Sequence, residues 1–142
     1  MDWWRTGNVP LHGWGYVTLE AATGPTASVA ATIRRLHATP HIDASSIKAT
    51  RVASFAGQTF DATIVGTDRP PVCRTIRCAE GVSIAGKGQL FHIIVVDVRG
   101  KTVVIYLESG FADQPRFPPA KTFPTFLPYA QQMLATLRFP VK

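Results

Sequence analysis

The chain has 142 residues, of which 46% are hydrophobic and 17% are charged, and its formal net charge is +6. This composition is typical of a compact soluble domain and excludes a wholly disordered chain. No apolar run approaches the roughly 20 residues that a helix needs to cross a bilayer, so the sequence predicts no membrane-spanning helix. We expect a single domain over residues 1–142, with residues 1–13 as a candidate mobile N-terminal segment.

The positive charge is spread along the chain rather than gathered on one element. Its one local cluster consists of Arg69, Arg74 and Arg77, and no aromatic residue lies between them. Proteins that bind nucleic acids usually concentrate basic residues on one surface, often with aromatic groups that stack on bases. We therefore expect no specific nucleic acid partner, whereas electrostatic attraction to an anionic membrane or cell wall stays open.

The N-terminal segment and the cysteines bear on the cellular compartment. The segment MDWWRTGNVPLHGWGY lacks the basic start and apolar stretch of a signal peptide, so either the protein is cytosolic or a targeting segment has been removed. Cys73 and Cys78 fit neither a redox C-x-x-C motif nor a four-cysteine zinc site. We expect a disulfide between them, which would indicate an oxidising compartment, with two free thiols as the alternative.

The first third of the chain predicts a strand and a helix. Residues 13–19 have the alternation of a short strand, and residues 26–39 have helical spacing. Thr26 or Ser28 can cap the helix, and Pro40 ends it. The apolar stripe of this helix is Val29, Ile33 and Leu36.

The middle of the chain predicts a hairpin formed by residues 46–55 and 58–65, with its turn at Ala56-Gly57. In the second strand apolar and polar residues alternate, as in a strand with one solvated face. One face holds Phe60, Ala62 and Ile64, and the other holds Thr59, Asp61 and Thr63. Residues 66–88 are rich in turn signals, with a short strand expected at 82–84.

The strongest structural signal is the segment 89–109, in which two β-branched runs flank Arg99-Gly100-Lys101 and predict a hairpin. Its first strand is apolar on both faces, so we expect a layer on each side of the sheet. A long loop is predicted at 110–121 and a helix at 123–137, with Thr125 as N-cap and Pro128 in the first turn. The whole order predicts an α+β fold, an antiparallel sheet with an N-terminal and a C-terminal helix packed on it.

Three catalytic or metal-binding patterns are incomplete. Residues 81–87 fit a G-x-x-x-x-G-K phosphate loop, but Gly88 stands where Ser or Thr is needed. Pro40 breaks the helical spacing between His37 and His41 that a metal pair would need. Asp97 and Glu108 lie on neighbouring strands but not directly opposite each other, so a glycosidase pair is unsupported. We predict no catalytic residues, no metal site and no cofactor.

The candidates for ligand binding are weaker. His92 lies in an apolar strand, where a buried, hydrogen-bonded histidine is expected rather than a catalytic one. Aromatic side chains either cover the core or line a ligand pocket or partner surface, and both interpretations stay open. The candidate binding residues are Trp14, Tyr16, His92, Tyr106, Phe111 and Phe117.

Two motifs resemble the C-terminal pattern of small secreted proteins and lipoproteins of actinobacterial type: VVDVRGKTVVIYLES and, after a loop, FPTFLPYAQQMLATLRF. The segments SIKATRVASFAGQTFDATIV and TASVAATIRRLHATPHI are similar in style to an upstream hairpin and helix of these proteins, so the resemblance covers residues 26–139. It implies a PsbP-like fold, whose members mostly act as binding or assembly modules. It also implies membrane anchoring through a removed N-terminal segment, and it supplies no active site.

We therefore expect a non-enzymatic, extracytoplasmic binding or sensor module associated with the cell envelope, with an unknown protein or small molecule as its ligand. The alternative is a small hydrolase or isomerase with a site between sheet and helices. A binding module should show a pocket without clustered ionisable groups. An enzyme should bring His92, Asp97 or Glu108 together in a cleft. A purely structural interaction domain is a third possibility, which a large dimer contact would reveal.

Overall fold

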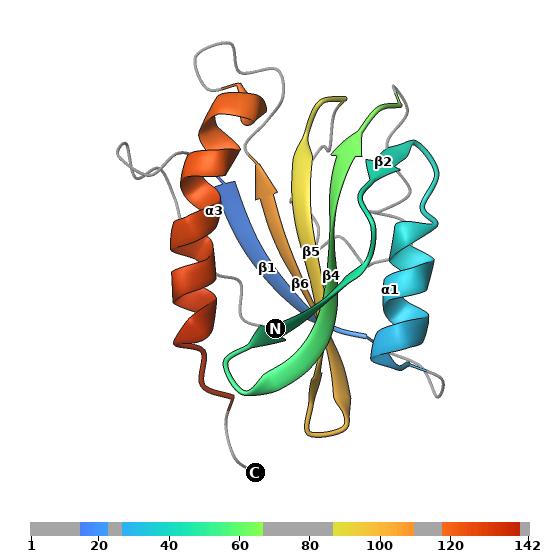
Figure 1. Ribbon diagram of the computed structural model, residues 1–142, viewed down its shortest axis with the longest axis vertical. Helices are drawn as coiled ribbons and strands as arrows, with labels where there is room; N and C mark the ends of the chain where they lie inside the picture. The colour runs from blue at the N-terminus through green and yellow to red at the C-terminus, as the bar shows by residue number, and fades with distance from the viewer. Residues whose placement is uncertain (1–14, 23–26, 67–86, 110–117, 140–142) are drawn as a thin grey trace.

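The computed structural model describes residues 15–22, 27–66, 87–109 and 118–139. Within these ranges, six strands form one sheet and two helices pack on it (Figure 1). In chain order the elements are β1 (Gly15–Ala21), α1 (Val29–His37), β2 (Ile42–Ala44), β3 (Lys48–Val52), β4 (Phe55–Ile64), β5 (Leu90–Val98), β6 (Lys101–Ser109) and α3 (Pro119–Ala135). The predicted α+β class, with a helix before and a helix after the main strands, is confirmed.

The sheet is antiparallel throughout, in the order β1-β6-β5-β4-β2. β3 also pairs with β4, and the residues Gly57 to Thr59 pair with β3 and β5 at once. β3 therefore lies on the same edge of β4 as β2. Ser45 interrupts this edge between the two strands: its N–H donates to the Asp61 carbonyl at 2.8 Å, and its hydroxyl accepts from the Asp61 N–H at 2.9 Å.

The hairpin of β5 and β6 lies at the centre of the sheet, as its sequence predicts. The two-residue turn has positive φ at Arg99 (55°) and Gly100 (82°), which is the pattern of a type I′ turn and matches the twist of the strands. The carboxylate of Asp97 accepts the Gly100 N–H at 2.6 Å and completes the turn. Val98 pairs with Lys101, so Lys101 belongs to β6 rather than to the turn.

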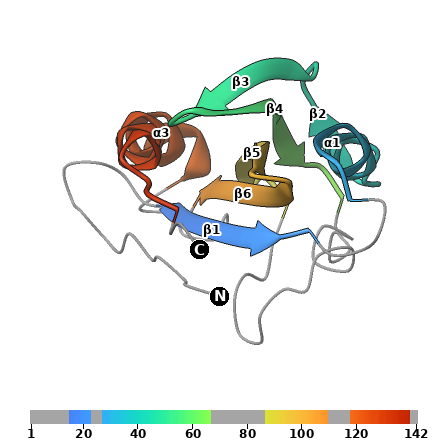
Figure 2. The ribbon, with the colours of Figure 1, turned by 90° about the horizontal axis from the view of Figure 1, so that it is seen from below.

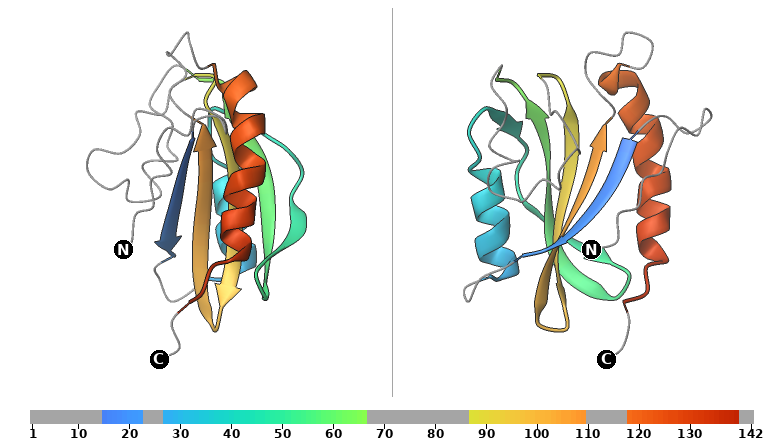
Figure 3. Two further views of the ribbon diagram at one scale, coloured as in Figure 1. Left: turned by 90° about the vertical axis from the view of Figure 1, so that its left-hand side faces the viewer. Right: turned by 180° about the vertical axis from the view of Figure 1, so that it is seen from behind.

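The two helices cover opposite faces of the sheet (Figure 2). On one face Ile33 and Leu36 of α1 pack on side chains of β4, β5 and β6, among them Phe60 and Ile93. On the other face Phe123 and Phe126 of α3 pack on β1, β5 and β6. The view from behind shows α1 and α3 on either side of the strands (Figure 3). The expectation that β5 needs a layer on each side is confirmed.

Helix α1 forms largely as its sequence predicts. The Ser28 hydroxyl accepts the Ala31 N–H at 3.1 Å, so Ser28 is the N-cap, and Ile33 and Leu36 are buried. Arg34 and Arg35 lie in the last turn, where positive charge interacts favourably with the helix dipole.

Helix α3 begins earlier than its sequence suggests. It starts at Pro119, with Pro118 as an N-cap that makes no side-chain hydrogen bond, so the expected Thr125 cap is wrong. Pro119 at the first helical position needs no N–H partner and has a φ already suited to a helix. Pro128 consequently lies in the helix interior rather than in the first turn. The buried stripe includes Phe123, Phe126, Ala130 and Leu134.

The hairpin of β3 and β4 turns at Ala53-Ser54, and the predicted turn at Ala56-Gly57 is wrong. Gly57 is needed for a close approach between strands: a Cβ at this position would lie 2.2 Å from the Val95 carbonyl oxygen. The alternation predicted for β4 is confirmed, because Phe60, Ala62 and Ile64 are buried. β2 was not predicted, and the strand expected at 82–84 lies outside the described residues.

Candidate functional site

The face that carries α3 is only partly covered by this helix. α3 packs mainly on β6, β1 and β5, and the polar side chains of β4 lie beyond it on the same face. Strand pairing aligns Thr59 with Ile94 and Asp61 with His92, so these polar groups adjoin the apolar floor below α3. The edge of the sheet curls toward the helix there, with β3 crossing above β4 and β5 in Figure 2.

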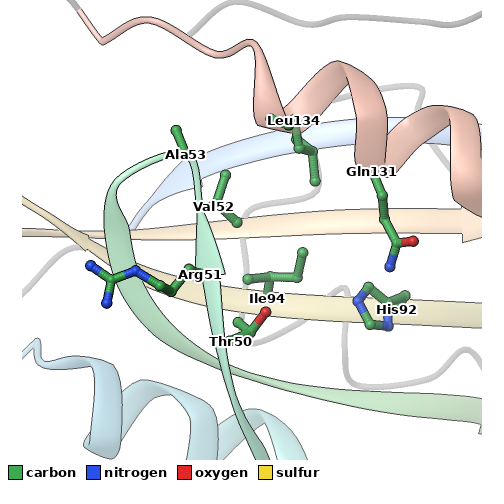
Figure 4. A pocket seen from close by; sticks show the side chains of 9 residues that line it. Thr50, Arg51, Val52, Ala53, His92, Ile94, Gln131 and Leu134 are labelled. Atoms are coloured by element: carbon green, nitrogen blue, oxygen red, sulfur yellow. The ribbon is translucent and has the colours of Figure 1, made fainter.

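A cavity of about 170 Å³ lies where β3, β5 and α3 meet (Figure 4). β5 forms its floor, and β3 and α3 form its walls. The lining residues are Thr50, Arg51, Val52 and Ala53, then His92 and Ile94, then Gln131, Leu134 and Ala135. We call this cavity the β3–α3 pocket.

The β3–α3 pocket has a polar end and an apolar middle. His92 and the amide of Gln131 lie at one end in Figure 4, and Ile94, Val52 and Leu134 lie beside them. Arg51 lines the wall, but its guanidinium points away from these side chains and donates to the Ser54 carbonyl at 3.2 Å. The pocket can therefore surround one apolar group and offer hydrogen bonds at one end.

Both ring nitrogens of His92 lie within hydrogen-bond distance of a polar side chain. Nδ1 lies 2.7 Å from Oδ1 of Asp61, and Nε2 lies 3.3 Å from the hydroxyl oxygen of Thr59. The Thr59 hydroxyl donates to the Ile93 carbonyl at 2.8 Å. A carboxylate only accepts, so Nδ1 carries a hydrogen. The prediction that His92 is hydrogen-bonded and largely buried fits its side chain, which is 12% exposed.

The side chains that an enzyme site was expected to bring together, His92, Asp97 and Glu108, do not lie near one another. Asp97 pairs with Thr102 and accepts the Gly100 N–H at the turn, and His92 pairs with Asp61 and Leu107. Glu108 is buried on the face of β6 that carries α1, opposite to the face of His92. Among the described residues, no group of three or more His, Cys, Asp or Glu side chains is placed to hold a metal ion.

The predicted binding residues do not form one site. His92 lies in the β3–α3 pocket, whereas Tyr106 is buried in the core on the α1 face. Tyr16 lies in β1, opposite Glu108 of β6. Trp14, Phe111 and Phe117 lie outside the described residues, and so do Cys73 and Cys78 with their expected disulfide.

Sequence reasoning missed most of the pocket. Thr50 comes from β3, Gln131 and Leu134 come from α3, and no local motif links them to His92 in β5. The alternation of β4 did place Thr59 and Asp61 on one polar face. Only the register of β4 against β5 shows that both touch His92.

No protein-family model matches the chain, and no curated protein matches it. Among solved structures, the chain is similar to a crystal structure from Pseudomonas aeruginosa, described as a protein of unknown function and putative regulator. The two share 13% identity with a TM-score of 0.51, and the match covers 90% of this chain and 85% of the other. Likeness at this identity shows the fold alone.

Proposed function

We propose that the chain is a non-enzymatic binding module whose ligand occupies the β3–α3 pocket. The observation that carries this proposal is the pocket itself, with an apolar floor and a polar end where the Gln131 amide lies beside His92. The imidazole of His92 is already bonded to Asp61 and Thr59, as in a positioned recognition group. Ligand sites of this kind combine apolar walls with a few fixed polar groups.

The compartment belongs to the same proposal. The resemblance to secreted proteins and lipoproteins supports an extracytoplasmic, cell-envelope setting with a PsbP-like architecture. No helix among the described residues is long and apolar enough to span a membrane. A thiol titration of the unreduced protein tests the setting: a paired Cys73 and Cys78 supports it, and two free thiols contradict it.

Backbone amide NMR tests the proposed binding. The probes are isobutyramide, leucinamide, benzamide and isobutyrate, added one at a time at millimolar concentration. We expect at least one of them to shift the resonances of Thr50, Ile94 and Gln131. Ala135→Trp fills the rim of the pocket from an exposed position and should abolish these shifts, whereas Gln132→Trp, exposed on the same helix but outside the lining, should not. No shifts with any probe, or shifts that persist in Ala135→Trp, would contradict the proposal.

A small hydrolase is the second candidate, and one observation favours it. Asp61, His92 and Thr59 follow one another as acid, imidazole and hydroxyl do in nucleophilic hydrolases. The Thr59 hydroxyl, however, already donates to the Ile93 carbonyl, and the residue lies inside a strand. Release of nitrophenol from short acyl esters, lost in both Thr59→Val and His92→Ala, would support this candidate. Equal rates in the wild type and Thr59→Val would exclude it.

A further inference from the structure

The two-residue turn Ala53-Ser54, which joins β3 to β4, determines which backbone groups of β3 point away from β4. Val52 and Phe55 flank the turn and form the hydrogen-bonded pair that closes such a hairpin. Hydrogen-bonded pairs recur at every second residue of an antiparallel ladder, so Thr50 and Lys48 also bond to β4. The N–H and C=O groups of Ala49 and Arg51 therefore point away from β4.

This outward edge borders the β3–α3 pocket. In Figure 4, the labelled residues of β3 lie between the curve of β4 and the group formed by His92, Ile94 and Gln131. In the part of the chain that the structure describes, β4 is the one strand that pairs with β3. An unpaired edge beside a pocket between strand and helix is the arrangement in which extended peptides bind by strand addition.

We propose that the β3–α3 pocket binds an extended peptide, which adds to the free edge of β3 as a further strand and inserts one side chain above β5. This inference rests on the proposed function and names its ligand class. Ala49 and Arg51 supply the backbone hydrogen bonds, and the pocket supplies the preference for the inserted side chain.

The volume of the pocket limits that side chain. About 170 Å³ is close to a dry cavity of about 150 Å³ that holds one benzene ring. It is smaller than the roughly 300–1,000 Å³ of pockets that enclose whole drug-sized molecules. Because Ile94, Val52 and Leu134 line it, the pocket fits one branched aliphatic side chain or one aromatic ring.

The charges around the edge favour an acidic residue near the inserted one. Lys48 is exposed and shares the pocket-facing side of β3 with Thr50 and Val52, because alternate residues of a strand share a face. Asp61, a carboxylate on this face, is already bonded to His92 and leaves the Lys48 ammonium as the charge that a peptide would meet. The peptide should therefore carry Asp or Glu two positions from the inserted side chain.

The test uses a fluorescent, end-blocked peptide of threonines with one central Leu and a Glu two positions away, measured by fluorescence anisotropy. We expect saturable binding that weakens at least tenfold when the alternate amides of the peptide are N-methylated, which blocks strand pairing and keeps the side chains. Ala49→Pro removes one outward N–H at an edge position that tolerates proline, and should weaken binding about fivefold or more. Ala49→Val keeps the N–H and should bind as the wild type does.

The possible failures are distinguishable. Binding that is abolished by Ala135→Trp but unchanged by N-methylation and by Ala49→Pro would leave the binding module intact and overturn strand addition. Isobutyramide binding without peptide binding would likewise leave the binding module intact and overturn strand addition. Loss of all probe binding would overturn the proposed function as well. A concentration-dependent dimer in the ultracentrifuge that Ala49→Pro disrupts would assign the edge to a second copy of the chain instead.

Discussion

Nδ1 of His92 lies 2.7 Å from Oδ1 of Asp61, its direct neighbour across the β4–β5 pair. The His92 side chain is 12% exposed, whereas that of Asp61 is 62% exposed. The contact thus joins a largely buried imidazole to a carboxylate that reaches water. Together with Thr59 on the other ring nitrogen, it fixes the orientation of His92 at the polar end of the β3–α3 pocket.

A double-mutant cycle should measure a modest coupling between His92 and Asp61. Asp61→Ala alone should cost less than about 1 kcal/mol of the free energy of unfolding, because the carboxylate is mostly solvated. His92→Ala should cost about 2 kcal/mol, because it also leaves a cavity and removes the partner of Thr59. We expect a coupling of about 0.5–1 kcal/mol in urea denaturation at low salt, falling at high salt.

The control for this cycle pairs His92→Ala with Asp43→Ala. Asp43 is an exposed carboxylate that pairs with Thr63 rather than with His92, so the two changes should add. A coupling of zero between His92 and Asp61 at low salt would contradict the interaction.

The hydrogen bonds also predict the protonation pattern of the ring. Nδ1 faces a carboxylate, which only accepts, so the neutral ring should carry its hydrogen on Nδ1. Nε2, which faces the Thr59 hydroxyl, should carry no hydrogen in that tautomer. Long-range nitrogen–proton NMR spectra distinguish the two nitrogens. A neutral ring with hydrogen on Nε2 would show that the contact with Asp61 is absent in solution.

Local patterns predicted much of the fold, but not the contacts that form the pocket. The alternation of Phe60, Ala62 and Ile64, the Ser28 cap and the two apolar faces of 90–98 all depend on neighbouring residues. The contact of His92 with Asp61 depends on the β4–β5 register across residues 65–89, which no local signal sets.

Two predictions that depended on glycine and proline were wrong for a related reason. Each residue type has two opposite uses, and the surrounding structure decides between them. Gly57 resembled a turn residue but permits a close approach to Val95, which is distant in sequence. Pro119 and Pro128 are both compatible with a first helical turn, and only packing shows which of them begins α3.

Gly57→Ala should destabilise the protein by about 3 kcal/mol or more, because the new methyl group would meet the Val95 backbone, which cannot rotate away. Ala56→Ser, at the exposed neighbouring position, should change the free energy of unfolding by less than about 0.5 kcal/mol. Urea denaturation measures both. If Gly57→Ala destabilised the protein as little as Ala56→Ser, β4 could not lie against β5 as closely as the structure places it.

The aromatic contact of Phe55 with Phe139 should fasten the β3–β4 hairpin to the segment after α3. The two rings meet edge to face with centroids 5.3 Å apart. Phe139→Ala should cost about 1–2 kcal/mol, from the lost ring contact and the lost buried area. Amide hydrogen exchange should accelerate at Val52 and Gly57, in hydrogen-bonded pairs of the hairpin, more than in β6. Uniform acceleration across the sheet would contradict a local role for this contact.

Pro128→Ala should stabilise the protein, because Pro128 lies in the interior of α3 on its exposed side. Alanine restores an N–H that can bond to the Pro124 carbonyl, and proline costs about 3 kcal/mol relative to alanine inside a helix. Proline also restricts the unfolded chain, which offsets up to about 1 kcal/mol, so we expect a net gain of about 1–2 kcal/mol in thermal or urea denaturation.

The matched variant is Pro119→Ala at the first position of the same helix. Pro119 needs no N–H partner there and is buried, so alanine should be neutral or destabilising. The different effects of Pro119→Ala and Pro128→Ala on the free energy of unfolding distinguish the two possible starts of the helix. With Thr125 as the N-cap, Pro128 would be in the first turn and Pro128→Ala would give no gain. A clear gain at Pro128 together with none at Pro119 therefore places the helix start at Pro119, which sets the positions of Gln131 and Leu134 over the pocket.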